Sequence, residues 1–413
     1  MIIMSSLEIA VTHHKAGRLA EALQVYRSVL ADDPDNVDAL HLAGVALNRL
    51  GHPQEAVEMI ERAASLGRPK ANMLFNLANA YRSAGRTEEA VNSYRAALAD
   101  DPEMESAHGA LWETLHAAGR VRTIVIAASD GGFFDLTRDL MMSIEDCRAG
   151  DTGFDIGFLD AGCDREQLAW LERRGVQVVP ITDGPAFRAP DKPVYTMAHT
   201  CRPHLREYFP GYDVYFWLDA DTWIQDPQAV STFVSQAVRS PRGVVAVREI
   251  DTGYVTLNRS SAAQAYYGAY HTRCASFCSP ELMQKLVFVP MFNAGVFAMH
   301  KDSHGWAAWA RHLDKALVDG FTHMIDQYAL NTALAEIGKV ANLPPTYNWI
   351  SSQCTPFRND RGKVCKPYHP YEELNIIHLT ASSQTFDGVK FMDLYRERRL
   401  VYEAARSLEP VIA

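Results

Sequence analysis

Two aspartates separated by one residue, Asp219 and Asp221, directly follow the apolar run Val214–Leu218. In an extended segment, residues i and i+2 point the same way, so both carboxylates can converge on one hard divalent cation. Burying such a pair without a compensating charge would be costly. A second Asp-x-Asp motif, at residues 33–35, has no apolar strand before it and is interpreted as a turn. The pattern therefore predicts a metal site at Asp219 and Asp221.

Further polar residues stand at positions suited to line such a site. Arg202 precedes Asp219 by 17 residues, Asn293 and Gly295 lie in the block 292–296, and His378 follows two isoleucines. Structural alternatives stay open: a histidine satisfied in the core, a turn at the Asn and Gly, and a solvated helical arginine. Asp326 begins a helical pattern, so it can cap that helix.

The elements that must position these residues alternate between strand-like and helix-like patterns. From the sequence we expect strands at 123–128, 154–159, 176–181 and 214–218, with helices from 133 to about 147, over 165–174 and over 196–208. This alternation predicts a mainly parallel sheet with helices on both faces. Ligands of such sheets bind at the carboxyl ends of the strands, where the aspartates lie.

The first part of the chain is organised differently, as a repeat. Gly17, Gly51, Gly85 and Gly119 are spaced by 34 residues, and apolar residues between them recur at helical spacing. Each unit is therefore predicted to be a helix, a glycine turn and a second helix. The pattern resembles the tetratricopeptide repeat (TPR), with small residues where helices meet and a tyrosine, Tyr26 or Tyr94, that fills the gap to the next unit.

This resemblance implies an all-α solenoid over residues 1–119, with three units and a capping helix at about 105–118. The middle unit departs from the pattern, with Ile60 in place of the aromatic residue. Such arrays present a concave surface to a peptide or partner protein, and the alternative is that the array forms a homodimer or supports the next domain. Because residues 1–119 carry a net charge of −6, we expect a basic or neutral peptide.

Composition limits the class of protein. The chain has 413 residues, enough for two or three domains, and its 47% hydrophobic and 22% charged residues are typical of folded proteins. A net charge of −10 argues against nucleic acid as a partner. No apolar run is long enough for a transmembrane segment, and no signal peptide is recognised. Seven scattered cysteines fit a reducing, cytoplasmic location better than a disulfide framework, and Cys274 and Cys278 lack partners for a zinc site.

The domain expected over residues 120–413 resembles, over about residues 121–385, a GT-A glycosyltransferase domain, an α/β, Rossmann-like nucleotide-diphospho-sugar transferase fold. The blocks are most similar to the family 8 retaining enzymes, which include glycogenin and bacterial lipopolysaccharide galactosyltransferases. They run from the end of the first strand through the paired aspartates to His378 and the acceptor-side Tyr347-Asn348, with a C-terminal helical tail beyond. The resemblance implies the following roles: donor binding by Ala127, Ser129, Asp130, Arg202, Asp219, Ala220, Asn293, Ala294 and Gly295; metal binding by Asp219, Asp221 and His378; catalysis by Asp326 and Gln327.

These features predict a metal-dependent enzyme that moves a sugar from a nucleotide sugar, with a UDP-sugar favoured, to a protein or glycan acceptor selected by the repeats. The cation is expected to be Mn²⁺ or Mg²⁺. The lysine that family 8 carries shortly after the metal histidine is missing, and Lys390 or Arg358 is a candidate substitute. The alternatives are a non-catalytic repeat adaptor with a degenerate sugar-nucleotide domain, or a sugar nucleotidyltransferase, which would need a basic glycine-rich loop.

The segment 251–280 is the expected acceptor-side insertion. It is rich in tyrosine and serine, and its tyrosines suit either stacking on a sugar or packing in the core: Tyr254, Tyr266, Tyr267 and Tyr270.

Overall fold

The computed structural model describes residues 5–148, 153–189, 191–240, 242–254, 260–286, 289–322 and 324–379, with two short strands after them. The chain divides into two compact units, Met1–Val121 and Arg122–Ala413. The expected C-terminal helical tail, and residues 380–384 where the family lysine is missing, lie outside the described residues.

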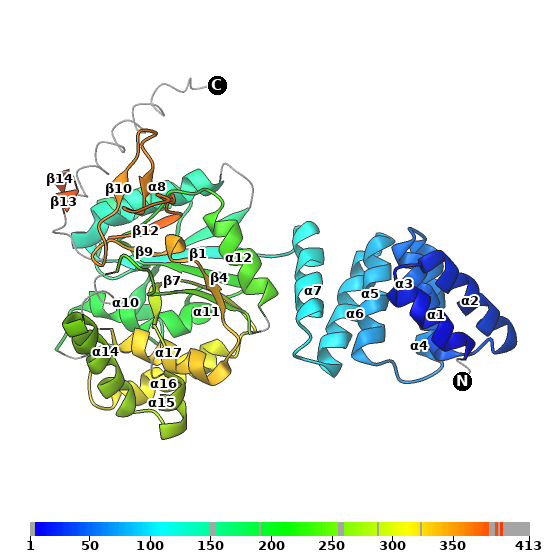
Figure 1. The fold of residues 1–413 in the computed structure, drawn as a ribbon. Helices are drawn as coiled ribbons and strands as arrows, with labels where there is room; N and C mark the ends of the chain where they lie inside the picture. Colours follow the sequence, from blue (N-terminus) through cyan, green and yellow to red (C-terminus); the bar gives the residue numbers. More distant parts are fainter. Residues whose placement is uncertain are drawn as a thin grey trace, which may run out of the picture. The chain divides into compact units, whose positions relative to one another are not determined.

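The first unit consists of helices that pack in antiparallel pairs (Figure 1, blue to cyan). The helices are α1 (Ser6–Lys15), α2 (Leu19–Asp32), α3 (Val37–Arg49), α4 (Pro53–Ser65), α5 (Ala71–Ser83), α6 (Thr87–Asp100) and α7 (Glu105–Ala117). Tyr26, Ile60 and Tyr94 are fully buried at equivalent positions of the three pairs. The isoleucine of the middle unit therefore fills the position that tyrosine takes in the other two.

The glycines of the 34-residue period close the turns of the array. Gly17, Gly51 and Gly85 have φ of +75°, +87° and +75°, a conformation that residues with a Cβ atom adopt at a cost. After each of them, the next backbone N–H reaches the carbonyl five residues earlier, as in the 2.9 Å bond from Arg86 to Tyr81. The period seen in the sequence is thus the period of helix C-terminal caps.

The second unit is built on a mixed, parallel-rich sheet in the order β3-β2-β1-β4-β7-β6-β8. Its strands are β1 (Thr123–Ser129), β2 (Phe154–Asp160), β3 (Gln177–Pro180), β4 (Val214–Leu218), β6 (Val244–Arg248), β7 (Phe292–His300) and β8 (Ala341–Leu343). Strand β7 is antiparallel to both of its neighbours, and the other pairs are parallel. The expectation of a mainly parallel sheet is therefore correct except at this central strand.

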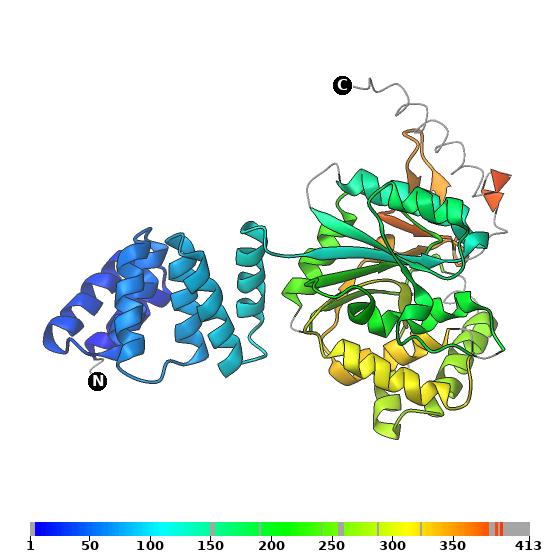
Figure 2. The same ribbon diagram turned by 180° about the vertical axis from the view of Figure 1, so that it is seen from behind.

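Helices cover both faces of the sheet: Figures 1 and 2 show α8 on one side and α16 and α17 on the other. A large core that includes Trp217, Trp306 and Trp309 fills the space beneath α16 and α17. The helices of this unit are η1 (Gly131–Phe133), α8 (Phe134–Arg148), α9 (Arg165–Glu172), η2 (Ile181–Asp183), η3 (Val194–Thr196), α10 (Met197–Thr200), η4 (Arg202–His204), α11 (Leu205–Tyr208), α12 (Ala229–Arg239), α14 (Ser260–Ala275), α15 (Pro280–Leu286), α16 (Gly305–Leu317), α17 (Ile325–Ile337) and η5 (Pro345–Tyr347).

The single long helix expected over residues 196–208 is wrong. The segment is broken into α10, the 3₁₀ turn η4 and α11. Pro203 has no N–H to donate and disfavours helical backbone at the residue before it. The break places Arg202 inside the domain, with 5% of its surface exposed.

A small second sheet adjoins the end of β4. It has the order β5-β12-β9, from β5 (Thr222–Ile224), β12 (Ile376–His378) and β9 (Trp349–Ile350). Strand β12 runs antiparallel to β5, and His378 pairs with Thr222. The short hairpins are β10 (Phe357–Arg358) with β11 (Val364–Cys365), and β13 (Thr385–Phe386) with β14 (Val389–Lys390).

Among the helices of the described residues, none is both long and apolar enough to cross a membrane.

Candidate metal centre

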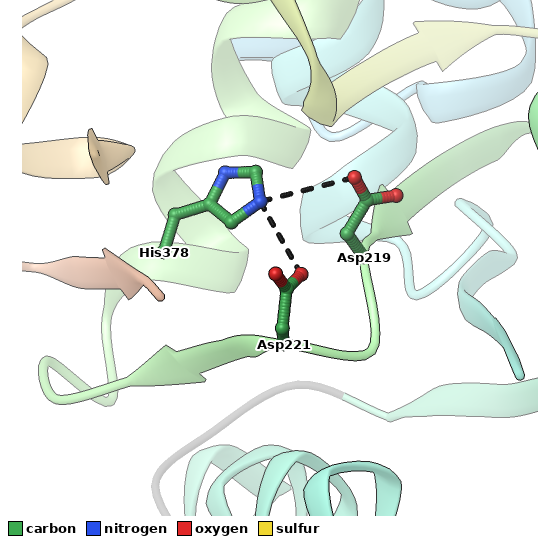
Figure 3. A group of neighbouring side chains, drawn as sticks. All are labelled: Asp219, Asp221 and His378. Atoms are coloured by element: carbon green, nitrogen blue, oxygen red, sulfur yellow. Dashed lines mark ion pairs between the residues drawn. The ribbon is translucent and has the colours of Figure 1, made fainter. Parts of the chain in front are cut away.

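Asp219, Asp221 and His378 come together where β4 leads into the small sheet (Figure 3). The Nε2 atom of His378 lies 3.3 Å from Oδ1 of Asp221 and 3.9 Å from Oδ2 of Asp219. One ligand atom from each residue falls within 4.8 Å of the other two. Pairing of β12 with β5 brings His378, 157 residues away in sequence, to the aspartates. The three predicted ligands therefore form one cluster.

The position of Asp219 is fixed by several hydrogen bonds. Its backbone N–H donates to the Gly295 carbonyl at 2.8 Å, which ties the end of β4 to β7. Its Oδ1 atom accepts from the indole N–H of Trp217 at 2.7 Å and from Nη2 of Arg202 at 2.5 Å. These donors occupy Oδ1, and Oδ2 is the oxygen that faces His378.

Gly295 gives this cluster its space. A Cβ atom at this position would lie 2.4 Å from Cε1 of His378 and 2.6 Å from Oδ2 of Asp219. Real Cβ atoms do not approach other atoms so closely, so any larger residue would displace the candidate ligands. The Gly of the 292–296 block is needed here for close approach, which rules out the simple turn considered from the sequence.

The ring of His378 is oriented by Asn348. Its Nδ1 lies 3.0 Å from the Oδ1 atom of Asn348, an oxygen that only accepts, so Nδ1 carries a proton. The Nε2 atom is thereby directed at the two aspartates. Burial lowers the pKa of His378, but the charges of Asp221 and Asp219 outweigh it, and the net pKa lies above its usual range. His378 is buried, as expected for a core histidine, but its Nε2 atom faces the carboxylates of Asp219 and Asp221 rather than apolar side chains.

Arg202 joins the metal cluster to α17. Its Nη1 donates to the carboxylate of Asp326, while Nη2 donates to Asp219. His199 approaches the other oxygen of Asp326 at 3.5 Å. Burial raises the pKa of Asp326, but the Arg202 guanidinium and His199 outweigh it, and the net pKa lies below its usual range. Arg202 is thus not the solvated helical residue that one interpretation proposed.

Asn293 and Gln327 meet in a buried amide network beside the cluster. Oε1 of Gln327 accepts from the backbone N–H of Ala294 at 3.1 Å, and Oδ1 of Asn293 accepts from Gly295 at 2.8 Å. The NH₂ groups of both amides donate to Glu249, at 2.8 Å from Asn293 and 2.9 Å from Gln327. The structure therefore brings together the β7 block and the start of α17.

Three donor-binding residues were expected at the end of β1: Ala127, Ser129 and Asp130. The side-chain hydrogen bonds of Ser129 and Asp130 are with α8 and η1 rather than with Asp219, Asp221 or His378. Ala127 is fully buried inside β1, so its side chain presents no surface to a ligand. Ser129 is buried and its hydroxyl lies 2.6 Å from that of Thr137. Asp130 accepts hydrogen bonds from the backbone of Gly132 and Phe133 and so caps η1. Ala220 lies between the aspartates and is 8% exposed.

Two of the four tyrosines in segment 251–280 are core residues. Tyr254 is fully buried against Trp349, and Tyr270 is 1% exposed in a cluster with Cys274 and Leu286. Stacking of these two rings on a sugar is therefore wrong, because their faces are already covered. The side chains of the other two lie outside the described residues. Arg358, one suggested replacement for the lysine, is exposed and donates to Gly362.

Glu249 and His199 belong to the site and were not found from the sequence. Glu249 comes directly after β6, just as Asp219 comes directly after β4. An acidic residue directly after a buried strand is a signal for a site residue. Glu249 carries this signal as Asp219 does, but it stands alone rather than in an Asp-x-Asp pair. His199 gave no such signal, because its contact with Asp326 joins residues that are 127 positions apart in the sequence.

The helical unit carries a groove of about 390 Å³. Its lining comes from α3, α5 and α7: Val45, Asn48, Arg49, Phe75, Asn76, Asn79, Arg82, Ser83 and Ala110. The hydroxyl of buried Tyr94 donates to Oδ1 of Asn79 at 2.7 Å, which leaves the NH₂ group of that amide for other partners. The lining has two arginines and no carboxylate, although Arg82 pairs with Glu113 nearby. The lining of the groove is thus positive whereas the whole array is negative, which argues against the basic half of the expected preference for a basic or neutral peptide.

Comparison with known proteins identifies the repeats. Two tetratricopeptide-repeat family models match residues 13–73 and 73–104. A probable UDP-N-acetylglucosamine–peptide N-acetylglucosaminyltransferase SPINDLY from Hordeum vulgare is 31% identical over 90 residues. The match covers 22% of this chain, and the chain spans about a tenth of the barley protein.

Solved structures of MamA also match. A point mutant of MamA is 26% identical, with 28% of this chain and 67% of that chain covered and a TM-score of 0.26. A MamA fragment from Desulfovibrio magneticus RS-1 is 19% identical, with 28% and 65% covered and a TM-score of 0.27. The family models and the geometry of the helices establish that the N-terminal region carries tetratricopeptide repeats, followed by a mixed α/β region with a parallel-rich sheet.

Proposed function

We propose that residues 122–413 form a GT-A-type glycosyltransferase domain that moves a sugar from a nucleotide sugar, most readily a UDP-sugar, to an acceptor held by the repeats. The observation that carries this proposal is the cluster of Asp219, Asp221 and His378, next to the buried Arg202–Asp326 pair. Two carboxylates and an imidazole at the carboxyl end of a sheet strand are suited to a metal–diphosphate complex.

The donor set fits Mn²⁺ or Mg²⁺. Carboxylate oxygens suit both ions, and the imidazole favours Mn²⁺ of the two. The space that Gly295 leaves beside Asp219 and His378 supports a bound ion there, because a Cβ atom would fill it. A bound cation would neutralise the diphosphate and stabilise the departing nucleotide.

The other residues hold and orient the sugar. Asp326 is buried and paired with Arg202, so its depressed pKa makes it a weak proton acceptor and suits it to hold the Arg202 guanidinium beside Asp219, next to the sugar. Gln327 and Asn293 have fixed amides at the adjoining face. Asp326 and Glu249 are already bonded to neighbouring side chains, so neither carboxylate is placed to attack the sugar as a nucleophile. This supports transfer with retention by front-face attack, in which oxygens near the sugar stabilise the developing positive charge.

The repeats would select the acceptor. The barley protein that matches part of the chain is named as a peptide glycosyltransferase, which favours a protein acceptor over a glycan. Asn76 and Asn79 line the groove with amides, which suit the backbone of an extended peptide, and the positive charge of Arg49 favours acidic side chains on it. All seven cysteines are free thiols, which supports a reducing, cytoplasmic compartment.

Thermal unfolding with a panel of UDP-, GDP- and CMP-sugars, with and without Mn²⁺, tests this proposal. A ligand that binds the folded state raises the melting temperature by mass action. We expect a metal-dependent shift with one nucleotide class that disappears in Asp219→Asn/Asp221→Asn. The control is Asp33→Asn/Asp35→Asn, the same change in the other Asp-x-Asp motif, which lies in a turn between repeats.

The control should keep the full shift. Absence of a shift with every donor in the wild-type protein would contradict the proposal and favour a non-catalytic repeat adaptor. A shift that persists in Asp219→Asn/Asp221→Asn would place the nucleotide elsewhere.

A further inference from the structure

A continuous chain of hydrogen bonds runs from His378 away from the metal cluster. Nδ1 of His378 donates to Oδ1 of Asn348 at 3.0 Å, and Nδ2 of Asn348 donates to Oδ1 of Asn293 at 3.0 Å. Nδ2 of Asn293 donates in turn to Oε1 of Glu249 at 2.8 Å. Every link donates in the same direction, and the chain ends on a carboxylate, which can only accept while ionised.

The members of this chain are buried. Asn348 is 2% exposed, Glu249 3%, His378 4% and Asn293 8%. In such surroundings a hydrogen bond is strong, and a misdirected donor is costly because no water replaces its partner. A reversed amide at Asn293 would point its NH₂ group at the backbone N–H of Gly295, which now donates to it at 2.8 Å.

We infer that Glu249 is a positioning residue for the metal centre, which acts through Asn293 and Asn348 to hold the Nδ1 proton of His378 and present Nε2 to the cation. A histidine that ligates a metal commonly donates its second ring N–H directly to a carboxylate or carbonyl. Here two asparagine side chains extend that connection, Asn293 from β7 and Asn348 from the position directly after η5. The inference rests on the proposed metal site and adds to it a residue that touches neither metal nor sugar.

Glu249 also orients the side-chain amide of Gln327. Nε2 of Gln327 donates to the same Oε1 atom at 2.9 Å, so Oε1 of Gln327 is left to accept from Ala294 at 3.1 Å. A single carboxylate oxygen thereby sets the direction of an amide on the metal side and of one on the sugar side.

Mn²⁺ affinity, measured by calorimetry or by the EPR signal of free Mn²⁺, tests the inference without relying on activity. Glu249→Met removes the terminal acceptor with little change of volume, and we expect affinity to fall roughly 10- to 100-fold. Glu249→Gln can still place an oxygen where Oε1 lies, so it should lose less. The matched control is Asp251→Asn, which removes another buried carboxylate that follows β6 but bonds to Tyr368 and Lys366 instead.

A double-mutant cycle shows whether the effect passes through the chain. Asn348→Ala cuts the connection, so adding Glu249→Met to Asn348→Ala should change Mn²⁺ affinity no further. If Glu249→Met binds Mn²⁺ as the wild type does, or loses as much affinity in the Asn348→Ala background, the inference is overturned and the proposed function stands. If the wild-type protein binds neither Mn²⁺ nor Mg²⁺, both are overturned.

A measurement on the wild-type protein covers the case in which Glu249→Met does not fold. With Cd²⁺ bound as a diamagnetic ion, ¹⁵N spectra of histidine-labelled protein should show His378 protonated at Nδ1 and ligated through Nε2. Asp219→Asn/Asp221→Asn identifies the responding ring. Ligation through Nδ1 would overturn the inference.

Discussion

At the scale of single residues, the candidate site is organised by Arg202. The guanidinium bonds to Asp219 on one side and to Asp326 on the other, and its centre lies 5.1 Å from the Trp217 ring. One buried cation therefore serves two carboxylates from distant parts of the chain. Removal of one partner from such a group leaves charge uncompensated, which costs more than the pair itself contributes.

Arg202→Met should destabilise the protein by about 3–5 kcal/mol at pH 7, because two carboxylates lose their partner. The penalty should shrink as the pH falls. In the wild type the pKa of Asp326 is lowered, so this group contributes stability above its unfolded pKa of about 3.9 that is lost as the pH falls through its folded pKa. In the variant, burial without the guanidinium raises that pKa, and protonation relieves the buried charge.

Urea unfolding of both proteins between pH 7 and pH 5 measures the difference. A gap in the free energy of unfolding that stays constant or widens toward pH 5 would contradict this account of Asp326.

Gly295→Ala should weaken Mn²⁺ binding at least tenfold, since the added methyl group would overlap Cε1 of His378 and Oδ2 of Asp219. Gly268→Ala is the control, because a Cβ atom there meets nothing within 4 Å. Titration of both variants with Mn²⁺ measures the change in affinity. Equal affinity in the two variants would show that the ion does not use the space beside Gly295.

At the scale of elements, much of the fold could be predicted because buried strands and repeats leave short-range patterns. The apolar runs before Ser129, Asp160 and Asp219 are β1, β2 and β4. The break in the helix over 196–208 was missed because its apolar spacing is helical and only Pro203 interrupts it. Strand β7 was not among the predicted strands, and its antiparallel direction depends on partners far apart in sequence.

The site was partly predictable for the same reason. Asp219 and Asp221 are neighbours on one strand end, so their convergence follows from local geometry. The contacts of Glu249 and His199 depend on side chains from other elements; the position of Glu249 after β6 is a local signal, but its hydrogen-bond partners are not. The resemblance of ordered blocks placed His378 with the aspartates, which spacing alone would not have done.

Gly85→Ala should destabilise the repeats by about 1–2 kcal/mol, because its φ of +75° is costly for a residue with a Cβ atom. Gly67→Ala provides the comparison: this glycine has no positive φ, and an added Cβ meets nothing within 4 Å. Denaturant unfolding of the full chain, followed by helical circular dichroism, measures both. An equal effect of the two substitutions would contradict the assignment of Gly85 as a helix C-terminal cap.

At the scale of the whole molecule, the two units carry separate chemistry. All three candidate ligands lie in Arg122–Ala413, and the arginine-lined groove lies in Met1–Val121. The net charge of −10 for the whole chain therefore does not give the local charge at either the groove or the metal centre. Groove and metal centre present their own local charges, and local charges decide which ligand binds.

Mn²⁺ should stabilise the second unit specifically. At a free concentration about 100 times Kd, binding adds about 2.7 kcal/mol to the free energy of unfolding of the unit that holds the ligands. Scanning calorimetry measures the midpoint temperature of each unfolding transition. We expect Mn²⁺ to leave unchanged the midpoint of the transition that Gly85→Ala lowers, which belongs to the repeats. The midpoint of the other transition should rise with Mn²⁺ and fall again with EDTA. A rise of the Gly85-sensitive transition would place the ion in the repeats.

We infer that the α/β unit transfers the sugar of a nucleotide sugar to an acceptor, or to water when no acceptor is present, with the help of a metal that Asp219, Asp221 and His378 would hold. The most direct test is release of the nucleotide from a panel of nucleotide sugars, followed by NMR with and without Mn²⁺. We expect Mn²⁺-dependent release from one donor class, abolished in Asp219→Asn/Asp221→Asn and retained in Asp33→Asn/Asp35→Asn. Tight binding of Mn²⁺ and donor, with no release in the presence or absence of acceptor peptides, would contradict it and identify the domain as a sensor of sugar nucleotides.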